Sequence, residues 1–149
     1  MIPLSVAALL LQTAGAAPPT TKSCLWLDSN EALTPCDDVA NCVSSRNDMG
    51  DAQRYVRPLL LGEDPALART RVLRMMQDQE RTQLVAASDS CFHYTTQSRV
   101  FGFVDDIVFT FEHTGGVVQI RSESRSGYWD LGVNRKRVEH YREQLAPKY

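Results

Sequence analysis

Hydrophobic positions in the second half of the chain recur with two different periods. From residue 64 to about residue 78 they fall at i, i+4, i+7 and i+8, which places one apolar stripe along an α-helix. Asp64 followed by Pro65 is a helix start, because aspartate caps free amides and proline fits the first helical position. The predicted stripe consists of Ala68, Val72, Met75 and Met76.

After Glu80 the period changes to two, which is typical of strands with one buried face. We expect four strands, over residues 82–88, 91–96, 104–112 and 117–122. Their short connections predict an antiparallel meander. Residues 20–64 are rich in turn signals, and there we expect only a short strand within residues 54–60, which Pro58 would confine to a sheet edge.

The last two strands predict their own register. If Thr114 and Gly115 form the turn, Phe111 pairs with Val118 and apolar side chains meet on one face, as a buried face requires. The same register pairs Phe109 with Ile120 and Ile107 with Ser122, and on the opposite face Val108 with Arg121. The polar side chains Asp106, Arg121, Glu123 and Arg125 should therefore gather on that opposite face.

A second helix is expected at the C-terminal end. It starts near Asp130 or Asn134, either of which can cap it, and it ends before Pro147. Its apolar stripe is Val138, Tyr141 and Leu145. The element order favours a two-layer α+β domain, a four-stranded antiparallel meander with two helices packed on one face.

The N-terminus predicts export. Residues 2–11 form an apolar run that is followed by small residues, the pattern of a secretory signal peptide. The run is far shorter than the roughly 20 apolar residues that span a bilayer, so no membrane span is expected after signal cleavage. We expect a signal peptide over residues 1–17, an N-terminal arm over 18–40 and a single α+β domain over 41–149, in a periplasmic or extracellular protein.

Four cysteines are compatible with two disulfides in an oxidising compartment, and three connectivities are possible. A Cys24–Cys36 bridge would close a short loop and tie down the N-terminal arm, which leaves Cys42 to pair with Cys91 or to stay free. A reactive thiolate at Cys42 would need a cationic neighbour, and Arg46 is the nearby candidate.

Charge is distributed unevenly, although the formal net charge is only −2 and predicts no nucleic-acid binding. Residues 24–64 carry eight acids and three bases, whereas residues 121–149 carry seven bases and four acids. Two patches that attract each other in the fold would explain this distribution. An anionic ligand at the basic end is the alternative.

The junction between the last strand and the last helix concentrates charge, glycine and aromatic residues. Gly127 and Gly132 permit a tight turn that aims helix amides outward, where arginines would suit a carboxylate or phosphate. Alternatively, the arginines pair with nearby acids. The candidate binding residues are Asp106, Arg121, Arg125, Tyr128, Trp129, Asp130, Asn134, Arg135 and Arg137.

No reaction signature is visible. Adjacent strand residues point to opposite faces, so Asp105 and Asp106 are not a catalytic pair. Asp106 should neutralise Arg121 or Arg125, and the inward Asp105 needs a hydrogen-bond partner. Cys91 and His93 share a face but lack a third ligand, so neither a metal nor a cofactor is expected.

Four blocks of this sequence resemble a known family. They are residues 41–46 (NCVSSR), 101–106 (FGFVDD), 121–127 (RSESRSG) and 130–137 (DLGVNRKR). In this order and spacing they are similar to the domain of unknown function 1499, over about Asn41 to Leu145. The resemblance implies a small domain without an established activity, so it implies no catalytic residue.

Together these features favour a non-enzymatic, exported accessory domain that binds a protein partner or an anionic small ligand through the junction. The alternative is a hydrolase or transferase acting on an anionic substrate, with Asp106 or Asp130 as the general base. That alternative requires a pocket in which one of the two carboxylates is unpaired.

Overall fold

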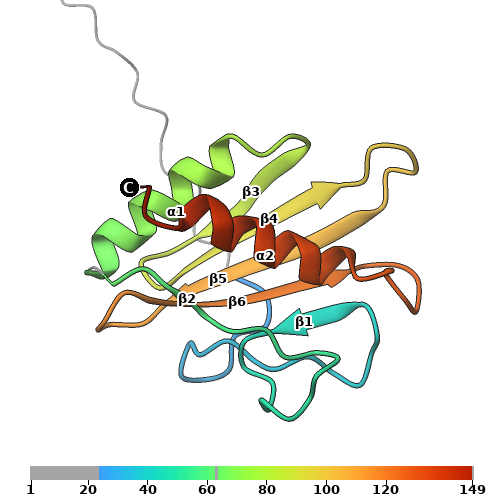
Figure 1. Cartoon of the computed structure of the whole chain (residues 1–149), viewed down its shortest axis with the longest axis horizontal. Coiled ribbons are helices and arrows are strands. Elements are labelled where there is room, and N and C mark those ends of the chain that lie inside the picture. Colours follow the sequence, from blue (N-terminus) through green and yellow to red (C-terminus); the bar gives the residue numbers. More distant parts are fainter. Residues whose placement is uncertain (1–23, 63, 149) are drawn as a thin grey trace, which may run out of the picture.

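Two helices lie together on one face of a six-stranded sheet (Figure 1). The computed structural model describes residues 24–62 and 64–148, so the predicted signal peptide lies outside the described residues. The helices are α1 (Pro65–Gln77) and α2 (Val133–Leu145). Neither of these described helices is long and apolar enough to cross a membrane.

The sheet contains the predicted meander and two further strands. The meander is β3 (Thr82–Ala87), β4 (Cys91–Gln97), β5 (Val104–Phe111) and β6 (Val117–Ser124). Two short strands, β1 (Cys42–Ser44) and β2 (Leu59–Leu60), both pair antiparallel with the outer edge of β6. The short strand expected within residues 54–60 is confirmed as β2, which covers only its last two residues, whereas β1 was not predicted. β6 would otherwise expose a long edge, and segments of three and two residues are too short to show a period in the sequence.

The predicted register of the last hairpin is confirmed. Phe111 lies opposite Val118, Phe109 opposite Ile120 and Val108 opposite Arg121. The apolar side chains of this hairpin face the helices and form the main core together with the stripes of both helices. The fully buried members from the two helices include Val72 and Met76 of α1 and Val138 of α2.

The N-terminus of α1 matches the sequence prediction, whereas the N-terminus of α2 differs from it. The carboxylate of Asp64 accepts the amides of Ala66 and Leu67 at 2.9 and 3.0 Å, as expected of a cap. At α2 the first helical residue follows Gly132, whose φ of 76° lies in the left-handed region. The prediction of Asn134 as a cap is wrong, because Asn134 lies inside the helix and is fully buried.

Residues 24–40 form a layer on the sheet face opposite the helices. Cys24 and Leu33 from this segment pack with Cys91 of β4 and Val108 of β5 in a second apolar cluster, against which Trp26 also packs. Both faces of the sheet are thus covered. The expectation of a two-layer domain with a separate arm did not include this layer, because the outward side chains of the strands are mostly polar.

The cysteine pairing differs from the prediction. The disulfides are Cys24–Cys91 and Cys36–Cys42, not Cys24–Cys36 and Cys42–Cys91. Residues 24–36 cross the outer face of the sheet. Cys24 therefore lies against Cys91 of β4, while Cys36 lies next to Cys42 of β1. Cys42 is not a reactive thiolate, because its sulfur is bonded to Cys36.

Candidate functional site: the junction between β6 and α2

Asp106 is engaged on the outer face of the sheet. Its Oδ1 lies 2.7 Å from Nε2 of His93 on the neighbouring strand, and Arg125 donates to the same carboxylate from Nε at 2.7 Å and from Nη2 at 2.9 Å. Burial opposes ionisation, but the bonds from His93 and Arg125 outweigh it and lower the pKa of Asp106 to about 2. The expectation that Asp106 neutralises Arg121 or Arg125 is confirmed for Arg125.

Arg121 is enclosed by the N-terminal layer. Only 2% of it is exposed, and its Cζ lies 4.2 Å from the ring centroid of Trp26. It donates to the Thr34 hydroxyl at 3.0 Å, to the Pro35 carbonyl at 2.8 Å and to Oε2 of Glu123. Through these contacts Arg121 connects residues 26–35 to β6.

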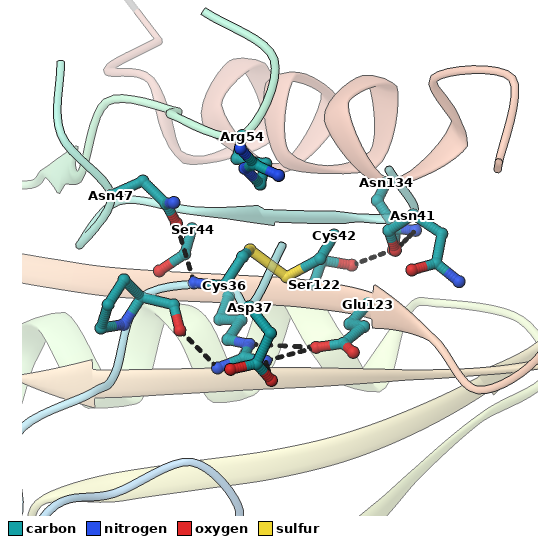
Figure 2. The surroundings of a disulfide bond; sticks show 12 residues. Cys36, Asp37, Asn41, Cys42, Ser44, Asn47, Arg54, Ser122, Glu123 and Asn134 are labelled. Atoms are coloured by element: carbon teal, nitrogen blue, oxygen red, sulfur yellow. Dashed lines mark hydrogen bonds and ion pairs between the residues drawn. A yellow bond between two sulfur atoms is a disulfide. The ribbon is translucent and has the colours of Figure 1, made fainter. Parts of the chain in front are cut away.

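The Cys36–Cys42 disulfide lies beside Asp37 and Glu123, the two acids that face Arg121 (Figure 2). Cys42 is the register partner of Glu123 across β1 and β6, and Asn47 accepts the amide of Cys36 at 2.8 Å. On the outside, a carboxylate oxygen of Asp37 lies 3.8 Å from Arg121. The chain turn that leads into β1 is thus held by the disulfide and by charge.

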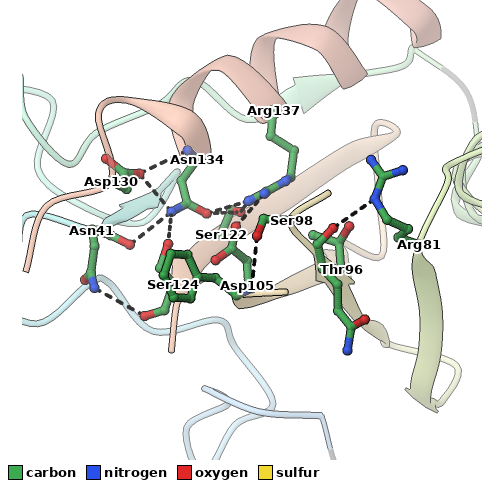
Figure 3. A network of polar contacts seen from close by, with 12 residues as sticks. Asn41, Arg81, Thr96, Ser98, Asp105, Ser122, Ser124, Asp130, Asn134 and Arg137 are labelled. Atoms are coloured by element: carbon green, nitrogen blue, oxygen red, sulfur yellow. Dashed lines mark hydrogen bonds and ion pairs between the residues drawn. The ribbon is translucent and has the colours of Figure 1, made fainter. Parts of the chain in front are cut away.

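A buried polar network lies on the other face, beneath the start of α2 (Figure 3). Asn134 is its centre. Its Nδ2 donates to the Asn41 carbonyl at 3.1 Å, to the Ser124 hydroxyl at 2.9 Å and to Oδ2 of Asp130 at 2.8 Å. Its Oδ1 accepts the Ser122 hydroxyl at 2.6 Å. One side chain therefore connects β1, β6, the junction and α2.

The Asp130 carboxylate completes the turn into the helix. It accepts the amide of Gly132 at 2.9 Å and the amide of Asn134 at 3.0 Å. Burial raises its pKa, whereas the bonds from Asn134 and Gly132 lower it more, so that the pKa of Asp130 lies below its ordinary value. Asp130 thus binds backbone amides at the N-terminus of α2 as a capping residue does, although it lies two residues before Gly132, which occupies the N-cap position.

Two further arginines of the junction bind the protein itself. Arg137 donates to Oδ2 of the inward Asp105 at 2.5 Å and to Oδ1 of Asn134 at 2.7 Å. Arg135 donates to three backbone carbonyls of the loop before β2 at 2.9 to 3.0 Å. The predicted partner of Asp105 is therefore an arginine on α2.

Large apolar side chains are exposed at the end of the sheet that carries the β4–β5 turn and the junction between β6 and α2. We call them the apolar tip: Val100, Phe101 and Phe103 in the β4–β5 turn, with Tyr128, Trp129, Leu131 and Val133 in the junction. Each is between 44% and 80% exposed. Of the predicted site residues, Tyr128 and Trp129 belong to this surface, whereas the polar ones belong mainly to the networks beneath it.

The two parts of the apolar tip leave neighbouring strands at the same end of the sheet (Figure 1). The amide of Arg125 donates to the Val104 carbonyl at 3.0 Å, which joins the start of β5 to the junction. Ser98 and Val133 both line a cleft of about 610 Å³, which Lys136 and His140 also line. The two parts of the tip therefore lie at the same end of the sheet.

A metal site is not formed by the part of the chain that the structure describes: no three His, Cys, Asp or Glu side chains come together there as ligands. Cys91 and His93 do share a face, as expected from the period-two pattern. Cys91 is bonded to Cys24, however, and His93 is bonded to Asp106.

The β4–β5 half of the tip was missed at the sequence level. Its signal was available, because Val100 to Phe103 is an apolar run around Gly102 at a position where two strands must be joined by a turn. Turns at a surface are ordinarily polar. Trp26 and Thr34, which cover Arg121, carried no comparable signal.

Comparison with known proteins identifies a family and no activity. No match was found among curated proteins or among solved structures. The sequence profile of one family, described as "Protein of unknown function (DUF1499)", matches residues 32–145, a range that begins before Asn41 and includes the strand layer, both helices and the junction. The chain therefore belongs to the DUF1499 family of proteins of unknown function.

Proposed function

We propose that this protein is a non-enzymatic, exported accessory domain that docks on a partner surface in the cell envelope through the apolar tip. One observation carries the proposal: seven large apolar side chains are exposed in the β4–β5 turn and in the junction, at the same end of the sheet (Figure 1). Isolated exposed apolar residues are ordinary, but this many at one end of a molecule indicate an interaction site.

The four arginines are poorly placed to clamp a small anion. Arg121 is buried, Arg135 and Arg137 are saturated by carbonyls and by Asp105, and Arg125 forms a bidentate pair with Asp106. An anion would have to displace these partners, and removal of one member of a buried pair is costly. The proposal therefore assigns these arginines to the fold.

The alternative of a hydrolase or transferase needs a carboxylate with a free lone pair directed at substrate. Asp106 accepts from Arg125 and interacts with His93, while Asp130 accepts from two amides and from Asn134. Both are held in their ionised forms by these partners. This engagement favours recognition over general-base catalysis.

Leu131 supports a role outside folding. Its φ of 57° places a residue with a bulky side chain in the left-handed region, and 66% of it is exposed. Such a residue costs about 1 kcal/mol in backbone energy and contributes little by burial. A side chain that the fold does not use is well suited to contact a partner.

The test is site-specific photo-cross-linking in producing cells. A benzophenone amino acid is placed at Trp129, and in a matched variant at His113, which is exposed in the β5–β6 turn at the opposite end of the sheet. We expect discrete adducts from position 129 and none from position 113. Equal labelling from both positions, or no adduct from position 129, would contradict the proposal.

A further inference from the structure

We infer that a pocket between β2 and the C-terminal end of α2 binds an alkyl carboxylate, that is, one apolar chain with an anionic head. The pocket has a volume of about 460 Å³. It lies at the end of the sheet opposite the apolar tip, because β2 pairs with Val117 and Val118 at the start of β6 (Figure 1). A ligand in this pocket would leave the apolar tip free for docking.

The walls of the pocket are mainly aliphatic. They include Pro58, Leu59, Leu60 and Leu61 around β2, with Leu145 and Pro147 at the end of α2. Leu59 and Leu145 are buried, whereas Leu60 is 72% exposed. Pockets of roughly 300–1,000 Å³ with apolar walls and a few polar groups are typical of small-molecule sites. Because a flat ring is held best by aromatic faces, aliphatic walls favour an alkyl chain.

The pocket is held in shape by arginines from both helices. Arg142 of α2 donates to the Pro58 carbonyl at 2.8 Å and to the Arg57 carbonyl at 2.7 Å, which joins α2 to the segment before β2. Arg71 of α1 donates to the Leu145 carbonyl at the end of α2. The segments that line the pocket are thus bonded to one another, so the protein alone forms the site and a ligand has little to order.

Two polar side chains of the pocket are available to a ligand. Tyr55 and Arg57 both line it and flank Val56, which is buried in the core. The Tyr55 hydroxyl and the Arg57 guanidinium form no hydrogen bond or ion pair with residues 24–62 or 64–148. A hydroxyl and a guanidinium are donors that a carboxylate accepts, and a guanidinium adds the charge. The polar side of the pocket therefore fits the head of an alkyl carboxylate.

The other charges at the pocket are engaged within the protein. Glu139 lies 2.9 Å from Nε of Arg142, and the described lining residues include no Asp or Glu. The carbonyl end of a helix disfavours an anion, but here the Leu145 carbonyl accepts from Arg71. Arg57 is the cation that these contacts leave over, which matches a ligand with one negative charge.

The experiment is isothermal titration calorimetry of the full chain with decanoate, with decanol and with hexanoate. Decanol has the same chain length without the charge, and hexanoate keeps the charge but has four methylenes fewer. We expect one decanoate site per chain. Decanol should bind about tenfold more weakly because it lacks the ionic contact, and hexanoate at least about tenfold more weakly because it buries less apolar surface.

Three variants separate the head from the chain. Arg57→Gln should weaken decanoate binding about tenfold and leave decanol binding unchanged. Arg99→Gln, which removes an exposed arginine from the β4–β5 turn at the other end of the sheet, is the matched control and should change neither. Leu60→Ser should weaken both ligands about fivefold. Equal affinities of wild type for decanoate and decanol, or an Arg57→Gln variant that binds decanoate like wild type, would overturn the assignment.

Amide resonances of the wild-type protein locate the ligand without any substitution. With decanoate, the signals of Leu60, Leu61 and Ala146 should shift, whereas those of Gly127 and Trp129 should not. Shifts confined to the apolar tip or to the apolar run at residues 2–11 would place the ligand elsewhere and contradict the pocket. Docking through the apolar tip is tested separately, by the cross-linker at position 129.

Discussion

The guanidinium of Arg121 lies over the ring of Trp26, with 4.2 Å between Cζ and the ring centroid. Arg121 is the most buried cation of the junction and lies in β6, the last strand of the chain. Trp26 lies in the segment that precedes the first strand, β1. A cation that is covered by an aromatic ring and bonded to Glu123 is withdrawn from solvent and from ligands. The N-terminal layer thus covers Arg121, whereas Arg125 and Arg137 are paired with Asp106 and Asp105 of β5.

Asn134→Ala should lower the free energy of unfolding by about 3 kcal/mol. The substitution removes every bond of a fully buried side chain and leaves Ser122, Ser124 and the Asn41 carbonyl short of partners. Urea denaturation measures the change. Lys136→Ala, on the exposed side of the same helix, is the control and should change stability by less than about 0.5 kcal/mol. Equal effects of the two substitutions would show that the network is not structural.

Asp106 predicts an acid-sensitive part of the stability. Its pKa is lowered from 3.8 to about 2 in the folded protein, so its contribution is fully present above the unfolded value and is lost as the pH falls through the folded one. This contribution is about 2 kcal/mol. The free energies of unfolding of wild type and Asp106→Asn should therefore converge between pH 4 and pH 2. Parallel curves over that range would contradict the assignment.

The two disulfides should differ in their effect on stability. Cys24–Cys91 joins residues separated by 67 positions, whereas Cys36–Cys42 spans only 6. In the chain-entropy description the first contributes about 4 kcal/mol and the second about 2 kcal/mol. Paired Cys→Ser variants, compared by denaturant titration, measure both. A larger loss for the Cys36/Cys42 pair would argue against the role of the long bridge in fixing the N-terminal layer.

Leu131→Gly should leave the protein as stable as wild type or stabilise it by up to about 1 kcal/mol, because glycine accepts a positive φ without strain. Thermal denaturation provides the measurement. A fall in the melting temperature would mean that the Leu131 side chain is needed for folding.

The elements that could be predicted from the sequence are those whose hydrophobic pattern is periodic. The stripe of α1 and the alternation of β5 and β6 are periodic over many residues, so both the helices and the hairpin register could be derived. β1, β2 and residues 24–40 have no such period. Their places depend on long-range contacts with β6 and β4, which local patterns do not encode.

The candidate site was predictable in its polar half and only partly in its apolar half. Strand register placed Asp106 on the same face as Arg121 and Arg125, which left either arginine as its partner, and the structure pairs it with Arg125. The disulfide partner of Cys91 did not follow, since the identity of the segment covering that face was unknown. Phe101 and Phe103 lie at the same end of the sheet as Trp129 only because β5 is aligned with β6.

The division of the junction into a structural network and an exposed apolar tip is tested most directly by one measurement. It is the free energy of unfolding of the variant Tyr128→Ser/Trp129→Ser/Leu131→Ser, determined by urea titration beside wild type. Because these side chains are exposed, the change should be below about 1 kcal/mol. A loss of about 3 kcal/mol, as expected for Asn134→Ala, would show instead that the tip is part of the folded core.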